Sequence, residues 1–387
     1  MRIAVSRAPG AKRVVTPLEL FFDLVYVFAI GQLSHHLVEH LDLRTGAETV
    51  IIALAVVYAW YMTTWAANWL EPDRLPVRLY LVGLMFASLL MSVAIADAFD
   101  GRAWLFVTGY LVLQIGRSAF LIAALRGRAL GEHFVNDLVW ELVIGSLWVA
   151  GAVAEGDARL VLWGLAVVAS HGGVWALHWL PGRGQRIDLE HTDIAGEHLI
   201  ERFRLFLIVA LGETVLTTGT AFTEQPFELE RLLALAIGFT GTVALWWCYF
   251  HRAEGIGLKV AETAEDAGTV GWTGTWTLTM MVLGLIGIAV GDELAIAHPG
   301  DDATLGFTLL TFGGPALFLL AQVFFLRQAL GNVPRSRSLG LAALAILAVA
   351  TAPLSLIVGI AASTGVLIAV AIADTVRKGD QTASSPG

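Results

Sequence analysis

Long apolar segments alternate with short polar ones along almost the whole chain. Apolar runs of 18 or more residues are typical of helices that cross a bilayer. Such helices are expected over 17–40, 48–70, 76–97, 102–125, 133–154, 158–180, 194–220, 229–252, 272–296 and 303–329. The last apolar block, 338–376, is long enough for two more, and Pro353 and Gly359 inside it leave the turn unplaced. The pattern predicts an all-α polytopic membrane protein with about 12 transmembrane helices.

The polar segments divide this chain into five parts. Residues 1–16 form a basic tail, and Pro17 then opens the first helix at its favoured first-turn position. A first six-helix half covers 17–180, a polar loop 181–193, and a second half 194–376. Residues 377–387 are expected to be a disordered tail. The first spanning helix is expected to act as the targeting signal, because no cleavable signal peptide is recognisable.

The distribution of Lys and Arg tests the helix count. With 12 helices, 17 of the 24 basic residues lie on the side of the N-terminal tail, four lie on the other side, and three lie inside helices. Cytoplasmic loops carry the excess of Lys and Arg. Both termini, the loop 181–193 and the C-terminal tail are therefore expected in the cytoplasm.

Composition narrows the class of protein further. The chain is 57% hydrophobic and 15% charged, whereas soluble proteins have roughly 25% charged residues. A net charge of −9 excludes a nucleic-acid partner, and the single Cys248 excludes an intrachain disulfide and a cysteine metal site. The chain has no phosphate-binding GxxxxGK[ST] loop, no GxSxG elbow and no lysine inside a helix. We expect the lipid bilayer as partner, no cofactor and no metal, and the oligomeric state stays open.

The two halves resemble each other. The segment 18–32, LELFFDLVYVFAIGQ, matches 200–213, IERFRLFLIVALGE, and the segment 93–99, VAIADAF, aligns Asp97 with Asp292 of 288–294, IAVGDEL. Matches in the same order predict a parallel repeat of six plus six helices, as in transporters whose halves rock about a central site. The alternative is chance similarity among apolar helices.

Charged residues inside these helices are the candidates for function, because each costs about 2.5–3.5 kcal/mol to insert. Glu19 and Asp23 are four residues apart on one helix face, so a cation is expected near them. The helix 194–220 offers His198, Glu201 and Arg202 at a similar depth. We expect these five residues to form a polar gate, or else an ion cluster that only locks two helices together.

Glu213 lies about a dozen residues into the helix 194–220, with no basic residue within seven positions. Such a carboxyl could bind and release a proton in a proton-coupled carrier. The alternative is a neutral, hydrogen-bonded Glu in a helix interface.

Arg117 and Glu141 lie at similar depth in neighbouring helices, roughly 12–14 Å from the cytoplasmic end. They are expected to pair, either as a structural brace or as a clamp on an anionic substrate.

Histidines give weaker signals. His36 and His40 have the spacing of a zinc face, but a solvated helix end is the favoured interpretation. His171 and His178, seven residues apart, would share a helix face and could relay protons, or be core histidines with backbone partners.

Two motifs, PLELFFDLVYVFAI at 17–30 and HLIERFRLFLIVALGE at 198–213, resemble the bacterial low temperature requirement protein A family. The resemblance covers about 15–375. It implies a polytopic protein of the bacterial inner membrane and a loose link to growth in the cold, without a settled activity. The polar motif residues are Glu19, Asp23, His198, Glu201, Arg202 and Glu213.

The leading hypothesis is a secondary transporter or ion pathway, coupled to protons, that moves an unidentified small solute or ion through a site between the helices 17–40 and 194–220. An intramembrane enzyme that modifies lipid, with or without a metal, is an alternative, although no residue is assigned as catalytic. A third hypothesis is a non-transporting membrane sensor or assembly protein.

Overall fold

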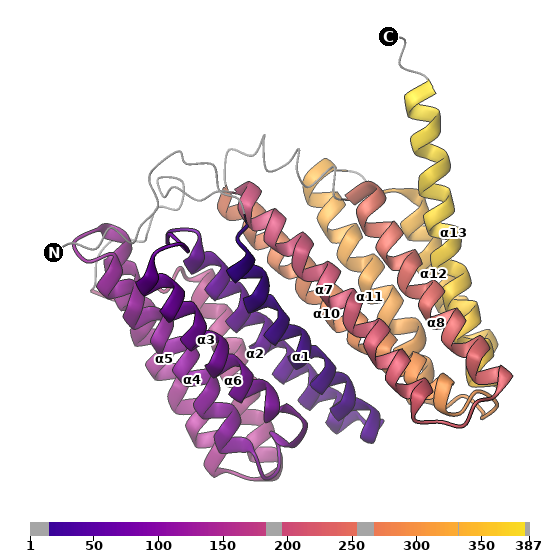
Figure 1. Ribbon diagram of the computed structural model, residues 1–387, viewed down its shortest axis with the longest axis horizontal. Coiled ribbons are helices and arrows are strands. Elements are labelled where there is room, and N and C mark those ends of the chain that lie inside the picture. The colour runs from indigo at the N-terminus through magenta and orange to yellow at the C-terminus, as the bar shows by residue number, and fades with distance from the viewer. Residues whose placement is uncertain (1–14, 183–195, 254–266, 332, 384–387) are drawn as a thin grey trace. The chain divides into compact units, whose positions relative to one another are not determined.

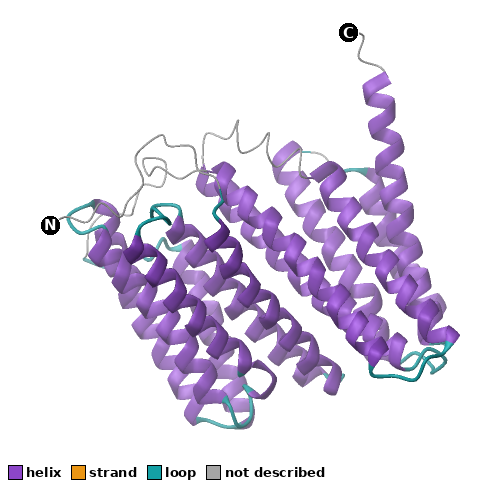
Figure 2. Ribbon diagram, viewed as in Figure 1, coloured by secondary structure: helices purple, strands orange, loops and turns teal. Residues whose placement is uncertain are grey.

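The computed structural model describes residues 15–182, 196–253, 267–331 and 333–383. Within these ranges it contains 12 α-helices and no strand (Figures 1 and 2). The helices are α1 Pro17–Glu39, α2 Leu43–Ala67, α3 Leu75–Val93, α4 Ala103–Ala124, α5 Ala129–Val153, α6 Gly156–Trp175, α7 Gly196–Thr223, α8 Leu229–Cys248, α10 Ala267–Ala297, α11 Leu305–Leu330, α12 Arg335–Thr351 and α13 Leu356–Ala383. Eleven candidate spans in these ranges are long and apolar enough to cross a membrane. The expected all-helical membrane architecture is therefore confirmed.

The structure places the turn that the sequence left open and moves the ends of two helices. The turn in the last apolar block lies between Thr351 and Leu356, and α13 continues to Ala383. The helix α6 ends at Trp175 instead of about 180, because Leu177 and His178 adopt left-handed backbone with φ of 51° and 50°. Most of the tail 1–16 and of the loop 181–193 lies outside the described residues.

Two compact units make up the described chain. The first holds α1 as far as His36, α2 to α6, and α7 as far as Arg202; the second holds α7 from Phe203, α8, α10 from Val270, and α11 to α13. In the first unit α3, α4, α5 and α6 pack on one another in chain order, and α2 packs on α4 and α6. In the second unit α13 packs on α8, α11 and α12. The start of α7 therefore belongs to the same unit as α1.

The start of α1 is fixed by its own side chains. The backbone N–H of Thr16 donates to Oε2 of Glu19 at 2.8 Å, and the N–H of Glu19 donates to Oγ1 of Thr16 at 3.4 Å. This is a capping box, and Pro17 occupies the first helical position without losing a hydrogen bond. The cap holds one oxygen of Glu19 at the helix start and leaves the other oxygen for a second partner.

Glycine allows α10 and α11 to approach closely in the second unit. A Cβ placed on Gly314 would lie 2.7 Å from the carbonyl oxygen of Gly284 and 2.9 Å from the backbone nitrogen of Ile288. Helices in a membrane associate through such contacts between small residues, since the apolar lipid gives little hydrophobic driving force.

We expect Gly314→Ala to destabilise the protein by about 1–3 kcal/mol, because the added methyl group forces two helix backbones apart. Gly313 is the matched control, since a Cβ there meets nothing within 4 Å. The Gly313→Ala variant should be neutral or up to about 1 kcal/mol more stable, because Ala favours helix over Gly. Thermal unfolding of both variants in detergent measures the difference, and equal stabilities would show that the contact is unimportant.

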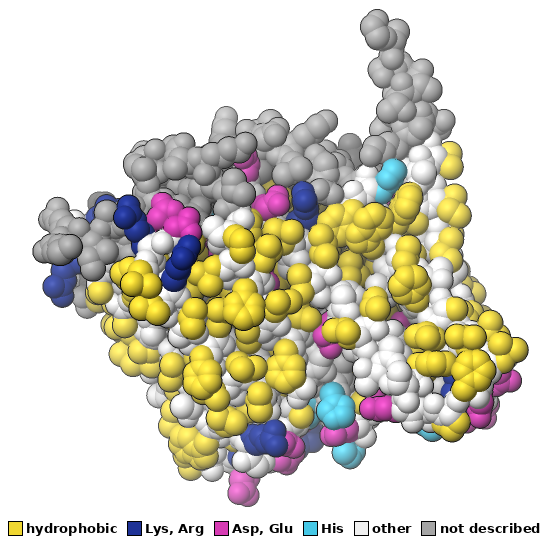
Figure 3. Space-filling view, viewed as in Figure 1, with side chains coloured by type: hydrophobic (Ala, Val, Ile, Leu, Met, Phe, Trp, Pro, Cys, Tyr) yellow, Lys and Arg dark blue, Asp and Glu magenta, His cyan; other side chains and the backbone are white. Residues whose placement is uncertain are grey.

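Apolar side chains cover the sides of the helices. Many large ones are exposed, among them Phe21, Leu79, Val168 and Leu216. Figure 3 shows hydrophobic side chains over the helix sides, with most charged side chains in view near helix ends. Exposed apolar surface of this extent on helices of spanning length indicates contact with the lipid bilayer.

Candidate functional site

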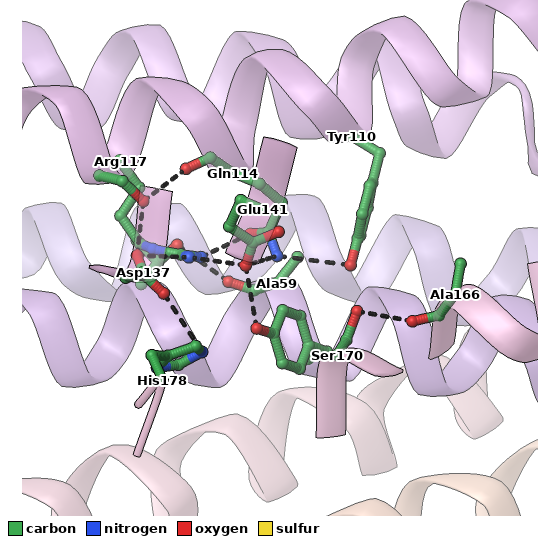
Figure 4. Close-up of polar contacts among 12 residues, drawn as sticks. Ala59, Tyr110, Gln114, Arg117, Asp137, Glu141, Ala166, Ser170 and His178 are labelled. Atoms are coloured by element: carbon green, nitrogen blue, oxygen red, sulfur yellow. Dashed lines mark hydrogen bonds and ion pairs between the residues drawn. The ribbon is translucent and has the colours of Figure 1, made fainter. Parts of the chain in front are cut away.

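The most extensive polar cluster in the described part of the first unit surrounds Arg117 (Figure 4). Helix α4 supplies Arg117, and α5 supplies Asp137 and Glu141, which are four residues apart and so share a helix face. The guanidinium lies 3.2 Å from Oε1 of Glu141 and 3.4 Å from Oδ2 of Asp137. All three side chains are at most 1% exposed. The expected contact between Arg117 and Glu141 is therefore present, together with a second carboxylate that was not expected.

Neutral groups complete the Arg117 cluster. Nη1 of Arg117 donates to Oε1 of Gln114 at 2.5 Å, and the Ser118 hydroxyl donates to Oδ2 of Asp137 at 2.5 Å. Oε1 of Glu141 accepts from the Tyr58 hydroxyl at 2.9 Å and from Nε2 of Gln114 at 3.3 Å. Oε2 of Glu141 is buried without a hydrogen-bond partner in the described chain. The two oxygens of Glu141 thus have different surroundings.

His178 contacts the Arg117 cluster from beyond the end of α6. Its Nε2 lies 3.4 Å from Oδ1 of Asp137. Burial lowers the pKa of His178 below the ordinary histidine value, against the opposing effect of Asp137. The ring is therefore neutral near pH 7. One positive guanidinium then faces two carboxyl groups, so the cluster carries one surplus negative charge unless it binds a proton.

A second cluster joins α1, α2 and the start of α7 within the first unit. Oδ1 of Asp23 accepts from Nη2 of Arg202 at 2.6 Å and from Nε1 of Trp60 at 2.7 Å. Oε1 of Glu19 lies 3.1 Å from Nε2 of His198 and 3.3 Å from Nη1 of Arg202. The guanidinium also lies over the Trp60 ring, 5.9 Å from its centroid, in cation–π geometry. The structure thus brings together Glu19, Asp23, His198 and Arg202 from the expected gate.

Two more of the expected site residues, Glu201 and Glu213, are also on α7. Glu201 precedes Arg202 in α7 and is half-buried. Glu213 lies in the second unit, also half-buried, and its Oε1 accepts from the Thr217 hydroxyl at 3.5 Å. No cationic side chain among the described residues pairs with Glu213.

Two interpretations of the histidines are wrong. His171 and His178 do not share a helix face, because α6 ends at Trp175; His171 instead contacts the carbonyl of Val167 at 3.0 Å. His36 is not at a solvated helix end. It is buried, with Nδ1 3.0 Å from the carbonyl of Ala96 and Nε2 3.4 Å from Glu48, whereas His40 is exposed. Tertiary packing against α2 and the segment after α3 buries the His36 ring.

A third ionic cluster lies in the second unit and centres on Arg337, which falls between the expected helix 303–329 and the last apolar block 338–376. Arg337 is buried near the start of α12 and pairs with Asp374 of α13. Its guanidinium also donates to Oε1 of Gln322 at 2.6 Å and to the carbonyl of Cys248 at 3.0 Å. Among the described residues of this cluster, one cation faces one carboxylate, and these two charges balance.

Sequence reasoning missed Asp137, although a usable signal existed. Asp137 and Glu141 repeat the spacing of Glu19 and Asp23, four residues apart on one helix face. The rule that led us to expect a cation beside Glu19 and Asp23 applies equally to Asp137 and Glu141. The two clusters of the first unit therefore share one design, with two carboxylates on one helix and an arginine on another.

Comparisons with known proteins agree with the two sequence motifs. The family model described as bacterial low temperature requirement A protein (LtrA) matches residues 14–372. An uncharacterized protein of Rhizobium meliloti (strain 1021) is 37% identical over 335 residues, which cover 84% of this chain and 80% of that relative. No solved structure matches the chain at a significant level. The family match spans both ionic clusters of the first unit and nearly every helix, and the chain therefore belongs to the bacterial low temperature requirement A protein (LtrA) family of multi-pass membrane proteins.

Proposed function

We propose that the protein is a proton-coupled secondary transporter or ion pathway of the bacterial inner membrane, with both termini in the cytoplasm. The observation that carries this proposal is the surplus carboxyl group in the Arg117 cluster. Arg117, Asp137 and Glu141 are almost completely removed from solvent, and one guanidinium balances only one of the two carboxylates. An uncompensated buried charge is very costly, so the cluster gains stability by holding one proton.

The contacts favour Oε2 of Glu141 as the atom that holds the proton. Oε1 of Glu141 accepts hydrogen bonds from Tyr58 and Gln114 and faces Arg117, as an anionic oxygen would. Oε2 has no partner in the described chain, so a proton there disturbs no existing hydrogen bond. Loss of this proton leaves a net negative charge among buried helices. A change of helix packing that admits a cation or water then becomes favourable, which is the coupling that a carrier needs.

The cluster of Glu19, Asp23, His198 and Arg202 is proposed as the gate, with Glu201 beside it. Two carboxylates face one guanidinium and one imidazole, so a single bound proton makes the cluster neutral. Glu213 remains a proposed second proton carrier on α7, supported by its position in a spanning helix without a cationic partner among the described residues. Arg117 is proposed as the residue that braces the proton site.

Proton flux in proteoliposomes tests the transport proposal. Full-length protein is reconstituted with a trapped pH-sensitive dye and challenged in turn with classes of small solutes, such as amino acids, organic acids and amines. We expect at least one class to drive proton movement, and we expect Glu141→Gln to abolish it. Glu155→Gln is the matched control, because Glu155 is exposed at the start of α6, and it should keep the flux. Solute uptake without proton movement, or full flux in Glu141→Gln, would contradict the proposal.

A non-transporting sensor or assembly protein is the second candidate. The observation in its favour is that both clusters of the first unit are sealed, with every ionic side chain at most 2% exposed. A carrier must open such a site during its cycle, whereas a structural cluster stays closed. The flux experiment separates the two, because a sensor gives no proton movement with any solute class.

A further inference from the structure

Asp292 lies at a small polar cavity inside the second unit. The carboxylate is on α10, five residues before the helix ends, and is 6% exposed. The cavity has a volume of about 10 Å³. Its polar lining comes from three helices: Asp292 of α10, Thr311 of α11, and Ser363 and Thr364 of α13. A space of this size holds one water molecule or one small ion.

The polar groups around the cavity are incompletely paired. Asp292 makes no hydrogen bond or ion pair with any described residue. Oγ1 of Thr311 is buried without a partner in the same ranges. Pro315 has no N–H, so the carbonyl of Thr311 loses its helical hydrogen bond. The Ser363 hydroxyl donates to that carbonyl at 2.8 Å. The lone pairs of the Ser363 hydroxyl oxygen and the second lone pair of the Thr311 carbonyl remain available to bind a ligand.

Three glycines make room for these oxygens. A Cβ on Gly238 would lie 3.0 Å from Oδ2 of Asp292, and one on Gly241 would lie 3.0 Å from Oγ1 of Thr364. A Cβ on Gly291 would lie 2.6 Å from Oγ1 of Thr311. Three of the four oxygen-bearing side chains at the cavity thus rest against a glycine, where an added Cβ would have to displace them. The arrangement is a close-packed cradle of oxygen atoms, and it does not resemble a packing defect.

The chemistry of this cradle fits a hard monovalent cation. Carboxylate, hydroxyl and carbonyl oxygens are ligands of hard cations, and carbonyls freed from a helix coordinate Na⁺ in transporters. One carboxylate balances one positive charge, so a monovalent ion leaves the buried site neutral. The small volume favours Na⁺ over the larger K⁺. We propose that the second unit binds one sodium ion between Asp292, Thr311, Ser363 and Thr364. This site is independent of the proton cluster, which belongs to the first unit.

Sodium-dependent stability of the full-length protein in detergent tests the proposal. Thermal unfolding is followed at fixed pH and ionic strength while NaCl replaces choline chloride or KCl. A ligand that binds only the folded state raises the unfolding midpoint as its concentration passes the dissociation constant. We expect a rise with Na⁺ that exceeds the rise with K⁺, and we expect Asp292→Asn to remove it. Radioactive ²²Na⁺ binding to the wild-type protein should show one site per chain.

Two isosteric variants test the site independently, in case Asp292→Asn does not fold. Thr311→Val removes the unpartnered hydroxyl and should weaken Na⁺ binding at least tenfold. Thr308→Val is the matched control on the same helix, since Thr308 is half-buried, does not line the cavity, and donates its hydroxyl to the carbonyl of Thr304; it should leave binding unchanged. Absence of Na⁺ binding in the wild type would overturn the proposal. A second result would also overturn it: an unfolding midpoint that responds to pH but not to Na⁺, with the pH response lost in Asp292→Asn. That result would mean that Asp292 holds a proton in the cavity.

Discussion

Replacing Arg117 with methionine should lower the free energy of unfolding by about 3–5 kcal/mol, because it strands two carboxyl groups in the interior of the first unit. Among the described residues, Arg117 is the one cationic side chain that pairs with Asp137 and Glu141, and the His178 ring beside Asp137 is neutral. Methionine keeps much of the side-chain volume, so the loss reports on charge more than on packing. Unfolding in mixed micelles with increasing SDS measures the change.

The charge count of the cluster predicts a much smaller change in stability for Glu141→Gln. This substitution removes the surplus negative charge and keeps the shape, so the expected change in stability is within about 1 kcal/mol. Comparing the two variants therefore tests whether the cluster has one more carboxyl group than it has positive charges. If Glu141→Gln were as damaging as Arg117→Met, the cluster would hold no spare proton and its proposed role would be wrong.

Replacing Asp374 of the Arg337 cluster with asparagine should lower the free energy of unfolding far more than Glu141→Gln does. Within the described chain Arg337 has one carboxylate partner, Asp374, and both side chains are buried. Asp374→Asn leaves the guanidinium uncompensated, and we expect a loss of about 3–5 kcal/mol in the same SDS titration.

Asp73→Asn provides the control for Asp374→Asn. Asp73 also pairs with one arginine, Arg78 at 2.8 Å, but both side chains are more than half exposed. A surface ion pair contributes about 0–1 kcal/mol, so the control should barely change stability. Similar losses for the two variants would mean that burial does not decide the strength of the Arg337–Asp374 pair.

The sequence predicted the helices well because the bilayer imposes a simple length and polarity rule on each one. It also predicted two ionic contacts. Depth counted from helix ends paired Arg117 with Glu141, and repulsion between Glu19 and Asp23 indicated a nearby cation, which is Arg202. Both arguments rest on periodicity and charge, which are local properties of the chain.

Two features could not be predicted from the sequence, the burial of Arg337 and the cavity at Asp292, because they depend on where helices end and on which helices pack together. Arg337 was assigned to a loop because hydropathy places helix ends only within a few residues, and one turn of helix turns a solvated arginine into a buried one. Asp292 was noticed only as the counterpart of Asp97. The two differ in environment, since Asp97 is half exposed and pairs with Arg102, whereas Asp292 faces the cavity. Its lining comes from α8, α10, α11 and α13, so no single segment of the sequence reveals it.

The double role of Glu19 has a consequence for biogenesis. One carboxylate oxygen closes the capping box of α1, and the other contacts His198 and Arg202. Arg202 follows Asp23 by 179 residues, which a ribosome needs roughly 10–35 s to synthesise. Trp60 emerges much earlier and is the first partner available to Asp23. Helix α1 therefore stays electrostatically incomplete while α2 to α6 are made, and it reaches its final contacts only after the start of α7 has been synthesised.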